Sequence, residues 1–380
     1  MLSVLVFVHE FGHFITAKRA GLRVDEFGFG FPPRVVGIQR VNGKWKLIWG
    51  SPKEFNPREG NTLYSINALP FGGFVRIKGE SGEEQEAQDS FASRSAGRRI
   101  WIIAAGVLMN ALLAVVLIAG GLSLGFPQVI NEGVSRYAHV SDARVQVMGI
   151  LPESPAARAH LVPGMRLISG NGIAFENAEA FKTFVTEFLG KSVTIVVEEN
   201  SLRREVTVVP ELLAETQKPG IGIGLADIAT VRYPVWLAIP KAVVITGVFI
   251  QTIVMTVVDL IANAIAGQHV SADLTGPIGI AVLTGQAARE GFVYLLQFMA
   301  ILSINLAILN IIPFPALDGG RILFIIIEKL RGRPVARSVE GWIHGIGFGI
   351  LIILILFVTY RDIGQYGERI TTFFKHLFGG

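Results

Sequence analysis

Long apolar stretches are the feature that most restricts the fold of this chain. Four have the length and composition of membrane spans, about 17 to 25 residues each, namely Met1–Ala17, Trp101–Phe126, Phe292–Ile312 and Trp342–Tyr360. Only 17% of the 380 residues are charged, against about a quarter in an ordinary soluble domain. The sequence therefore predicts a polytopic α-helical membrane protein with about four transmembrane helices.

Charge and cysteine content exclude several classes of function. The formal net charge is only +4, and the Lys and Arg residues do not form a basic patch with interleaved aromatic residues, so we expect no nucleic-acid partner. The chain has no cysteine, which rules out disulfides and zinc–thiolate sites. A metal site would therefore depend on histidine and carboxylate ligands.

A fifth apolar run, Ala242–Ala266, contains Gln251, Asp259 and Asn263, which are costly in hydrocarbon. Basic clusters are expected on the cytoplasmic side of a membrane, and this chain has three, at Lys18–Arg19, Arg94–Arg99 and Lys329–Arg337. Four crossings place all three inside, whereas a fifth crossing would place the last one outside. We therefore expect the fifth run to be a helix on the outer membrane surface or against the bundle.

The first span is not expected to be a signal peptide, because it has no charged start and contains a polar cluster. Since no polar segment precedes the span, we do not assume that Met1 is the native start of the protein.

Two connecting segments differ in character. Between residues 22 and 90, strand-like pieces alternate with Gly and Pro at Arg34–Ile38, Trp45–Trp49 and Phe71–Lys78, which predicts a hairpin touching the membrane from inside. Residues from about 127 to 210 predict a small soluble α+β domain on the outer side. Its expected elements are a strand at Val145–Ile150, a helix capped by Ser154 over Ser154–Ala159, a strand at Met165–Ser169, a turn at Asn171-Gly172, a helix at Ala178–Leu189, and strands at Val193–Val197 and Arg203–Val209 joined through Asn200-Ser201.

The sharpest chemical signal is the sequence His9-Glu10-Phe11-Gly12-His13. On a helix, two imidazoles four residues apart face the same way, and Glu10 lies on the adjacent flank. This is the pattern in which two histidines bind Zn²⁺ and the glutamate accepts a proton from the bound water. The alternative is a paired structural cluster, but three ionisable groups inside an apolar span favour a functional site.

A catalytic zinc usually has a third protein ligand. Asp318, which follows Pro313 and Pro315 at the end of an apolar span, is the best candidate. Asp259 competes with it but lies on the fifth run. The other interpretation of Asp318 is a carboxylate neutralised by Arg321.

Other polar residues in the spans are less informative. Asn305 and Asn310 are five residues apart and would face different directions on one helix. One of them could bind the substrate backbone, or both could join packed helices. A structural role is expected for Asn110. The remaining histidines lack a partner at ligand spacing and are expected to be ordinary polar residues, namely His139, His160, His269, His344 and His376.

Together these motifs resemble the site-2 protease family of intramembrane zinc metalloproteases, which act in regulated intramembrane proteolysis. The resemblance covers nearly the whole chain. It rests on His9–His13, Gly28–Gly30, Pro70–Val75, Ala104–Gly106 with Asn110, Thr275–Ile280 and Asn310–Gly320. The outer domain resembles a single PDZ domain. Met165 departs from the Asp usual in PDZ domains, and Val107 from the Pro usual in the second span.

The resemblance implies that His9, His13 and Asp318 bind Zn²⁺ and that Glu10 is the general base. It also implies a membrane-reentrant β-hairpin that receives the substrate by strand addition, and a loop that holds the unwound substrate. The residues in these two roles would be Gly28, Phe29, Gly30, Phe71, Gly72, Gly73, Asn310, Pro313 and Pro315.

The expected organisation is a first span, hairpin and second span in residues 1–126, a PDZ domain in 127–212, a region with a membrane-surface helix in 213–290, and two further spans in 291–380. The expected location is the bacterial cytoplasmic membrane, with the PDZ domain outside and the active site towards the cytoplasm. Expected partners are the lipid bilayer, a peptide ligand of the PDZ domain, and single-pass membrane substrates such as trimmed anti-sigma factors and signal-peptide remnants.

Two other functions remain to be distinguished from proteolysis. A non-catalytic membrane receptor or chaperone could use the PDZ domain and hairpin, with the metal cluster serving structure. A metal transporter would need ligands on several spans, and the sequence offers one cluster.

Overall fold

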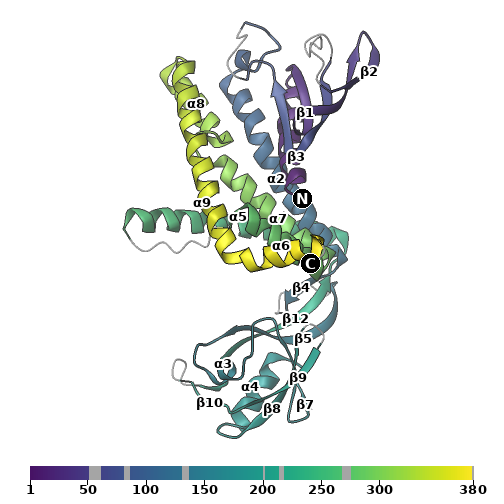
Figure 1. The fold of residues 1–380 in the computed structure, drawn as a ribbon, viewed down its shortest axis with the longest axis vertical. Helices are drawn as coiled ribbons and strands as arrows, with labels where there is room; N and C mark the ends of the chain where they lie inside the picture. Colours follow the sequence, from purple (N-terminus) through teal and green to yellow (C-terminus); the bar gives the residue numbers. More distant parts are fainter. Residues whose placement is uncertain are drawn as a thin grey trace. The chain divides into compact units, whose positions relative to one another are not determined.

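The computed structural model describes residues 1–50, 61–80, 86–130, 137–199, 202–213, 218–267 and 275–378. The chain divides into two compact units, one formed by residues 1–119 with 239–380 and the other by residues 120–238. The first is mainly helical with a small sheet, and the second is mainly β (Figure 1). The expected Asn200-Ser201 turn lies outside the described residues.

Long helices dominate the first unit. They are α1 (Leu2–Arg19), α2 (Ala96–Leu124), α5 (Val235–Ile265), α6 (Pro277–Glu290), α7 (Phe292–Ile311), α8 (Asp318–Arg331) and α9 (Arg337–Phe378), with α2 and α5 continuing into the second unit. A short 3-10 turn, Phe91–Ser93, precedes α2. Among the described residues, four segments are long and apolar enough to cross a membrane, namely Ala96–Leu124, Val235–Leu260, Phe292–Ile311 and Arg337–Gln365.

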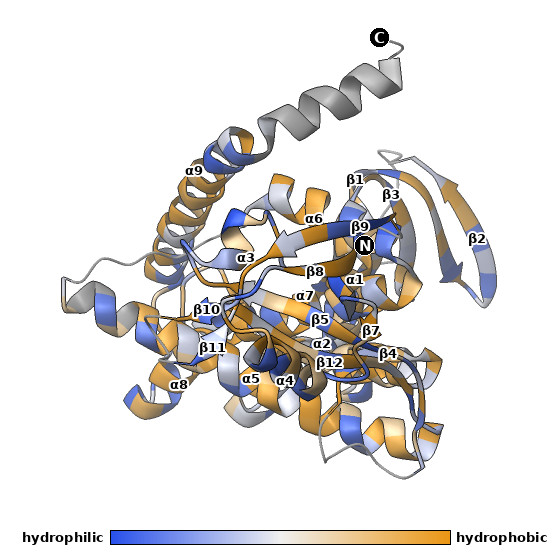
Figure 2. Cartoon of the chain, turned by 90° about the horizontal axis from the view of Figure 1, so that it is seen from below, coloured by the Kyte–Doolittle hydropathy of each residue, from blue (hydrophilic) through white to orange (hydrophobic). Residues whose placement is uncertain are grey.

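This set differs from the expected spans at two helices. α1, which we expect to cross, has 18 residues and includes Glu10, Lys18 and Arg19, so length and composition alone do not single it out. α5, which we expect on the outer membrane surface or against the bundle, is long and apolar enough to cross, and 6% of its most apolar stretch is buried within the protein. In Figure 2 much of α9 has the colour of hydrophobic residues.

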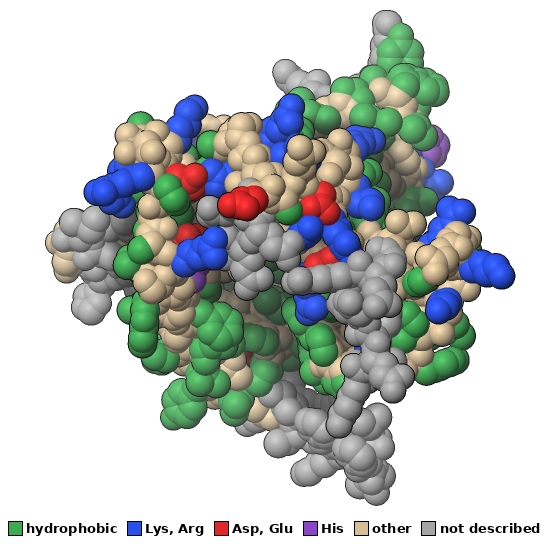
Figure 3. Space-filling view, turned by 90° about the horizontal axis from the view of Figure 1, so that it is seen from above, with side chains coloured by type: hydrophobic (Ala, Val, Ile, Leu, Met, Phe, Trp, Pro, Cys, Tyr) green, Lys and Arg blue, Asp and Glu red, His purple; other side chains and the backbone are tan. Residues whose placement is uncertain are grey.

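Polar contacts join the helix ends that carry the basic clusters. The Arg94 guanidinium donates to the carbonyl oxygen of Gly21, just after α1, at 3.4 Å. Arg99 at the start of α2 makes two hydrogen bonds, of 3.0 and 2.7 Å, to the carboxylate of Glu328 near the end of α8. The three clusters therefore lie at the same end of this unit, where Lys and Arg side chains are visible at the surface (Figure 3).

The Thr275–Ile280 motif forms the start of α6. Pro277 occupies the first helical turn, where its missing N–H costs no hydrogen bond. The amides of Gly276 and Gly279 donate to the carboxylate of Asp362 in α9, at 3.1 and 2.7 Å. Asp362 is 1% exposed, so this buried acid serves as a cap for α6.

The small sheet consists of β1 (Val24–Val41), β2 (Lys44–Trp49) and β3 (Leu63–Ile77) in the order β2-β1-β3. These strands contain the three strand-like pieces expected between residues 22 and 90, apart from Lys78. The end of β3, from residue 73 to 77, pairs only with β1 among the strands that the structure describes, which leaves its other edge without a strand partner. The sheet packs on α1, where the Phe7 and Phe14 rings lie 5.0 and 4.6 Å from that of Phe27.

The second unit contains one large antiparallel sheet in the order β4-β12-β5-β6-β8-β9, with β7 paired to β6. Its elements are β4 (Phe126–Val129), β5 (His139–Ile150), α3 (Pro155–Arg158), β6 (Arg166–Gly170), β7 (Ile173–Ala174), α4 (Ala178–Glu187), β8 (Val193–Glu199), β9 (Leu202–Val208), β10 (Glu211–Leu212), β11 (Pro219–Gly220) and β12 (Ile223–Arg232). The Ser154 side chain accepts the Ala157 amide, as expected for an N-cap. Asn171 and Gly172 both have positive φ in the hairpin between β6 and β7.

This sheet continues past residue 212, the expected end of the outer domain. β12 pairs with β5 over most of its length and with β4 at its end. The core contains side chains from β5, β6, β8 and both short helices, and Met165 is 1% exposed within it. Met165 therefore contributes to packing rather than to a surface.

Candidate active site

Three side chains from two distant segments meet inside the helical unit. His9 and His13 lie one turn apart on α1, and Asp318 begins α8 after the loop that follows α7. The Asp318 Oδ2 atom lies 2.9 Å from His9 Nε2 and 3.3 Å from His13 Nε2, and the two Nε2 atoms are 3.1 Å apart. These separations approach the edge of about 3.3 Å expected for a tetrahedron of ligands about 2.0 Å from one ion.

A backbone carbonyl fixes the tautomer of His13. Its Nδ1 atom lies 2.9 Å from the carbonyl oxygen of Ile102 in α2, which can only accept a hydrogen bond. His13 therefore carries its proton on Nδ1, and its Nε2 lone pair points towards His9 and Asp318. This is the arrangement of a metal-binding histidine oriented by a second hydrogen-bonding partner.

Asn110 plays the corresponding part for His9. Its side-chain amide is fully buried and lies 3.2 Å from His9 Nδ1, while its Oδ1 atom has no hydrogen-bond partner. Exchanging the amide nitrogen and oxygen gives Oδ1 a donor, His9 Nδ1–H, and leaves His9 Nε2 unprotonated. Two imidazole lone pairs and one carboxylate oxygen then face one point, which is a donor set that suits Zn²⁺.

Two glycines allow α1 and α2 to approach closely at the site. A Cβ atom on Gly12 would lie 2.3 Å from the carbonyl oxygen of Ala105. A Cβ atom on Gly106 would lie 2.5 Å from His13 Nε2 and 2.8 Å from His9 Cε1. The space for both imidazole rings therefore depends on the missing side chain at position 106.

Glu10 lies beside the histidines but is held by the sheet. The ligand atoms of His9, Glu10 and His13 lie within 4.8 Å of one another. Glu10 Oε2 accepts a hydrogen bond of 3.2 Å from the Val75 amide of β3. The edge of β3 that lacks a strand partner therefore runs next to the carboxylate that the sequence predicts to be the base.

The contacts distinguish between the alternatives for the third ligand. The Nε2 atoms of His9 and His13 both lie next to the carboxylate of Asp318, whereas Asp259 lies in α5. Arg321, the alternative partner of Asp318, forms its ion pair with Glu80, just after the end of β3. Asn310 Nδ2 lies 3.4 Å from His9 Nε2, so Asn310, rather than Asn305, reaches the site.

The other residues expected to contact substrate lie in two places. Gly72 and Gly73 of β3 pack against Val6 and Phe7 of α1, and Phe71 beside them is 74% exposed. In β1, Gly28 contacts Phe74, Phe29 packs edge-on against Phe7, and Gly30 has a positive φ. Pro313 and Pro315 lie in the loop between α7 and α8.

Sequence reasoning missed several residues that support the site. Asn110 was expected to be structural, and Val75 and Gly106 entered only as parts of motifs. His344 was expected to be an ordinary polar residue, yet its Nδ1 atom accepts the Ala316 amide at 2.8 Å. A polar residue inside an apolar span was the signal that the sequence offered for Asn110, whereas the other three contacts depend on tertiary structure.

Comparison with known proteins agrees with this geometry. The model of peptidase family M50 matches residues 1–51 and 48–354. The chain belongs to this family. It is 32% identical to the zinc metalloprotease RasP of Geobacillus kaustophilus and 28% identical to the regulator of sigma-W protease RasP of Bacillus subtilis, with 96% of both chains covered in each case.

Part of this chain is also similar to a PDZ domain of an SdrC-like protein from Listeria monocytogenes, at 25% identity with a TM-score of 0.21, over 23% of this chain and 92% of that one.

Family membership and the M50 relatives confirm the family expected from the motifs and identify a zinc metalloprotease. The four membrane-capable helices agree with a polytopic membrane protein.

Proposed function

We propose that this M50 protein is an intramembrane endopeptidase that cleaves single-span membrane proteins. The observation that carries the proposal is the convergence of His9 and His13 in α1 with Asp318 at the start of α8, beside the carboxylate of Glu10. His9, His13 and Asp318 would hold the zinc. When bound there, zinc supplies Lewis acidity that polarises a peptide carbonyl and acidifies a water molecule.

Glu10 is the proton carrier in this proposal. It lies close enough to the histidines to accept a proton from the attacking water and to return it to the leaving amine. The Val75 amide orients its carboxylate from the side of the sheet. The reaction consumes one water molecule and yields a new carboxylate and a new amine, so no other co-reactant is needed.

A substrate helix must be unwound before its peptide bonds are accessible, because its backbone groups are bonded to one another. Apart from the Val75 amide, which is bonded to Glu10, the edge of β3 at residues 73–77 that lacks a strand partner can supply replacement backbone partners to an extended segment. That edge runs past Glu10, so a strand added to it would lie beside the base. Asn310 and the loop with Pro313 and Pro315 would contact the same segment from the side of α7.

The functional test is cleavage of a model single-span substrate reconstituted with the protein in lipid vesicles. A substrate with Gly and Pro near its cytoplasmic end should be cleaved several-fold faster than one with an uninterrupted Leu-rich helix, because unwinding the first costs less. Mass spectrometry of the products should place the cut inside the span. Cleavage restricted to segments outside the membrane would contradict the proposal.

The contacts in the helical unit also support a membrane topology. Gly21, Arg99 and Glu328 lie at one end, so an even number of crossings separates residue 99 from residue 328. α2 and α7 supply two crossings, which leaves α5 on the outer surface or against the bundle. The basic clusters support a cytoplasmic location for this end, with the active site nearer to it, in a bacterial inner membrane.

The absence of cysteine makes this topology directly testable. Single variants Arg19→Cys and Arg333→Cys should react with a membrane-impermeant maleimide only when the cytoplasmic face is exposed, because both positions lie at the same helix ends. Lys182→Cys, on the exposed surface of α4, should react only from the opposite face. Labelling of Arg333→Cys from the same face as Lys182→Cys would show that α5 crosses the membrane.

The outer unit is proposed to be a PDZ domain that admits substrates whose outer part has already been trimmed, or that holds a peptide. Its support is the order of the elements from β5 to β9, with the capped helix α3 and the turn at Asn171-Gly172 in the expected places. Trimmed anti-sigma factors and signal-peptide remnants fit the proposed substrate class, because each retains one span and a short outer segment.

A further inference from the structure

The loop between α7 and α8 determines where Asp318 lies. It contains six residues, from 312 to 317, and Pro313 and Pro315 have no amide hydrogen. The amides of Phe314 and Leu317 bond within the loop, to the carbonyls of Ile312 and Phe314. Ala316 has a φ of 76°, a left-handed conformation that residues with a side chain rarely adopt. Ala316 lies two residues before Asp318, the proposed metal ligand.

An external contact holds this turn. The Ala316 amide donates a hydrogen bond of 2.8 Å to Nδ1 of His344 in α9. His344 therefore accepts at Nδ1 and, as a neutral imidazole, carries its proton on Nε2. Its ring also packs against Phe324 of α8, with the ring centroids 5.3 Å apart.

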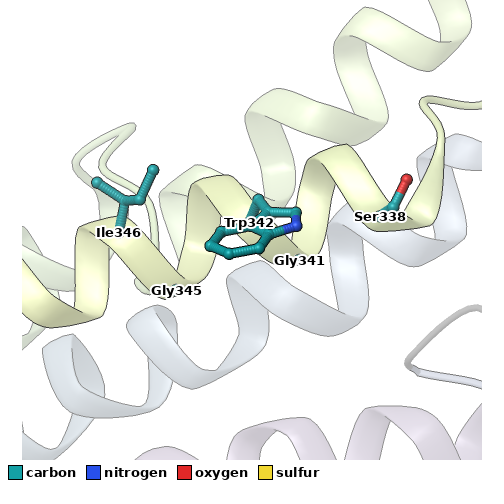
Figure 4. Close-up of a pocket in the computed structure, with 5 residues that line it drawn as sticks. All are labelled: Ser338, Gly341, Trp342, Gly345 and Ile346. Atoms are coloured by element: carbon teal, nitrogen blue, oxygen red, sulfur yellow. The ribbon is translucent and has the colours of Figure 1, made fainter.

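A glycine on the same side of α9 brings the helix against the loop. A Cβ atom at Gly347 would lie 2.5 Å from Pro315 Cβ and 2.7 Å from the Pro315 carbonyl oxygen. α9 thus contacts the loop at two successive residues. The hollow of about 570 Å³ on α9, lined by Ser338, Gly341, Trp342, Gly345 and Ile346, lies on another face of the helix (Figure 4).

The first turn of α8 packs tightly against the loop, so a displacement of the loop also displaces α8. Cβ atoms on Gly319 and Gly320 would lie 2.2 and 2.3 Å from the carbonyl oxygens of Ile312 and Phe314. The first turn of α8 therefore rests directly on the loop backbone. A shift at Ala316 would move the carboxylate of Asp318 relative to His9 and His13.

We propose that His344 is a positioning residue of the metal site, because its hydrogen bond to the Ala316 amide fixes the turn that presents Asp318 to His9 and His13. This inference rests on the proposed function of Asp318 as a zinc ligand. His344 itself touches neither histidine in the described contacts, so its effect passes through the loop. Residues that orient metal ligands typically contribute about 10- to 100-fold in metal affinity or activity.

The test compares His344→Leu, which removes the acceptor, with His344→Asn, whose side-chain oxygen can replace Nδ1. Zinc affinity is measured by chelator competition, and the visible spectrum of the Co²⁺-substituted protein reports coordination geometry. His344→Leu should bind zinc about 10-fold more weakly and change the cobalt spectrum, and His344→Asn should restore both. The matched control is His139→Leu, the same substitution at an exposed position of β5, which should leave both unchanged.

A second variant tests the other contact between α9 and the loop, that of Gly347 with Pro315. Gly347→Ala should push on Pro315 and alter the cobalt spectrum relative to wild type, a result that can be read even if His344→Leu does not fold. Wild-type zinc affinity and spectrum in His344→Leu, or failure of His344→Asn to restore them, would overturn the inference. Asp318→Asn separates the two proposals, since undiminished zinc binding in that variant would refute the ligand assignment itself.

Discussion

Glu10→Gln is expected to abolish cleavage while zinc remains bound. The amide has nearly the shape of the carboxylate and can still accept the Val75 hydrogen bond, but it cannot take a proton from water. Loss of a general base typically lowers the rate by about 10²- to 10⁴-fold, so kcat/KM for the model single-span substrate should fall by about 10³-fold. Zinc content should match that of the wild type, because Glu10 is not among the three proposed ligands.

The control for this variant is Glu187→Gln, the same change on the exposed end of α4, which should leave the rate unaltered. Cleavage by Glu10→Gln at the wild-type rate would remove Glu10 from the mechanism. If neither the wild type nor Glu10→Gln cleaved any membrane substrate while both bound peptides, the receptor or chaperone interpretation would be favoured.

Gly106→Val should cause the second large loss, this time of the metal itself. The new Cβ would lie within 3 Å of both imidazole rings, at 2.5 Å from His13 Nε2. α1 and α2 are closely packed here, since Gly12 lies against the Ala105 carbonyl, so the valine must displace the imidazoles or part the two helices. Displaced ligands should weaken zinc binding by about 100-fold and reduce cleavage with it, as measured by chelator competition on the purified protein.

Gly120→Val is the matched control for this prediction, because it makes the same change in the same helix at a position where a Cβ would meet no atom within 4 Å. It should bind zinc normally. Unaltered zinc affinity in Gly106→Val would mean that the imidazoles do not occupy the positions described here.

Local sequence patterns were sufficient to predict much of the structure of this protein. The four-residue spacing of His9 and His13 fixes their common face on any helix, so no tertiary information is needed to predict it. The Asn171-Gly172 turn and the Ser154 cap were also predictable, because each depends on the backbone preference of one or two residues. Asp318 could be proposed because a carboxylate after two prolines is costly in an apolar setting.

Other features depend on contacts between distant residues, which no local pattern encodes. The support of His9 by Asn110 joins residues 101 positions apart, and the contact between Ala316 and His344 joins the loop before α8 to α9. The strand β12 belongs to the second unit only because it pairs with β5, about 80 positions earlier in the chain. The role of Gly106 follows from the packing of α1 on α2, which a list of motifs does not reveal.

The most direct test of the central claim is X-ray absorption spectroscopy at the zinc edge, on the wild-type protein and on Asp318→Asn. The account predicts two imidazole nitrogens and at least one oxygen at about 2.0–2.2 Å in the wild type, with zinc lost or its oxygen shell altered in the variant. Identical spectra and full zinc occupancy in both proteins would show that Asp318 does not join His9 and His13, and the site described here would be contradicted.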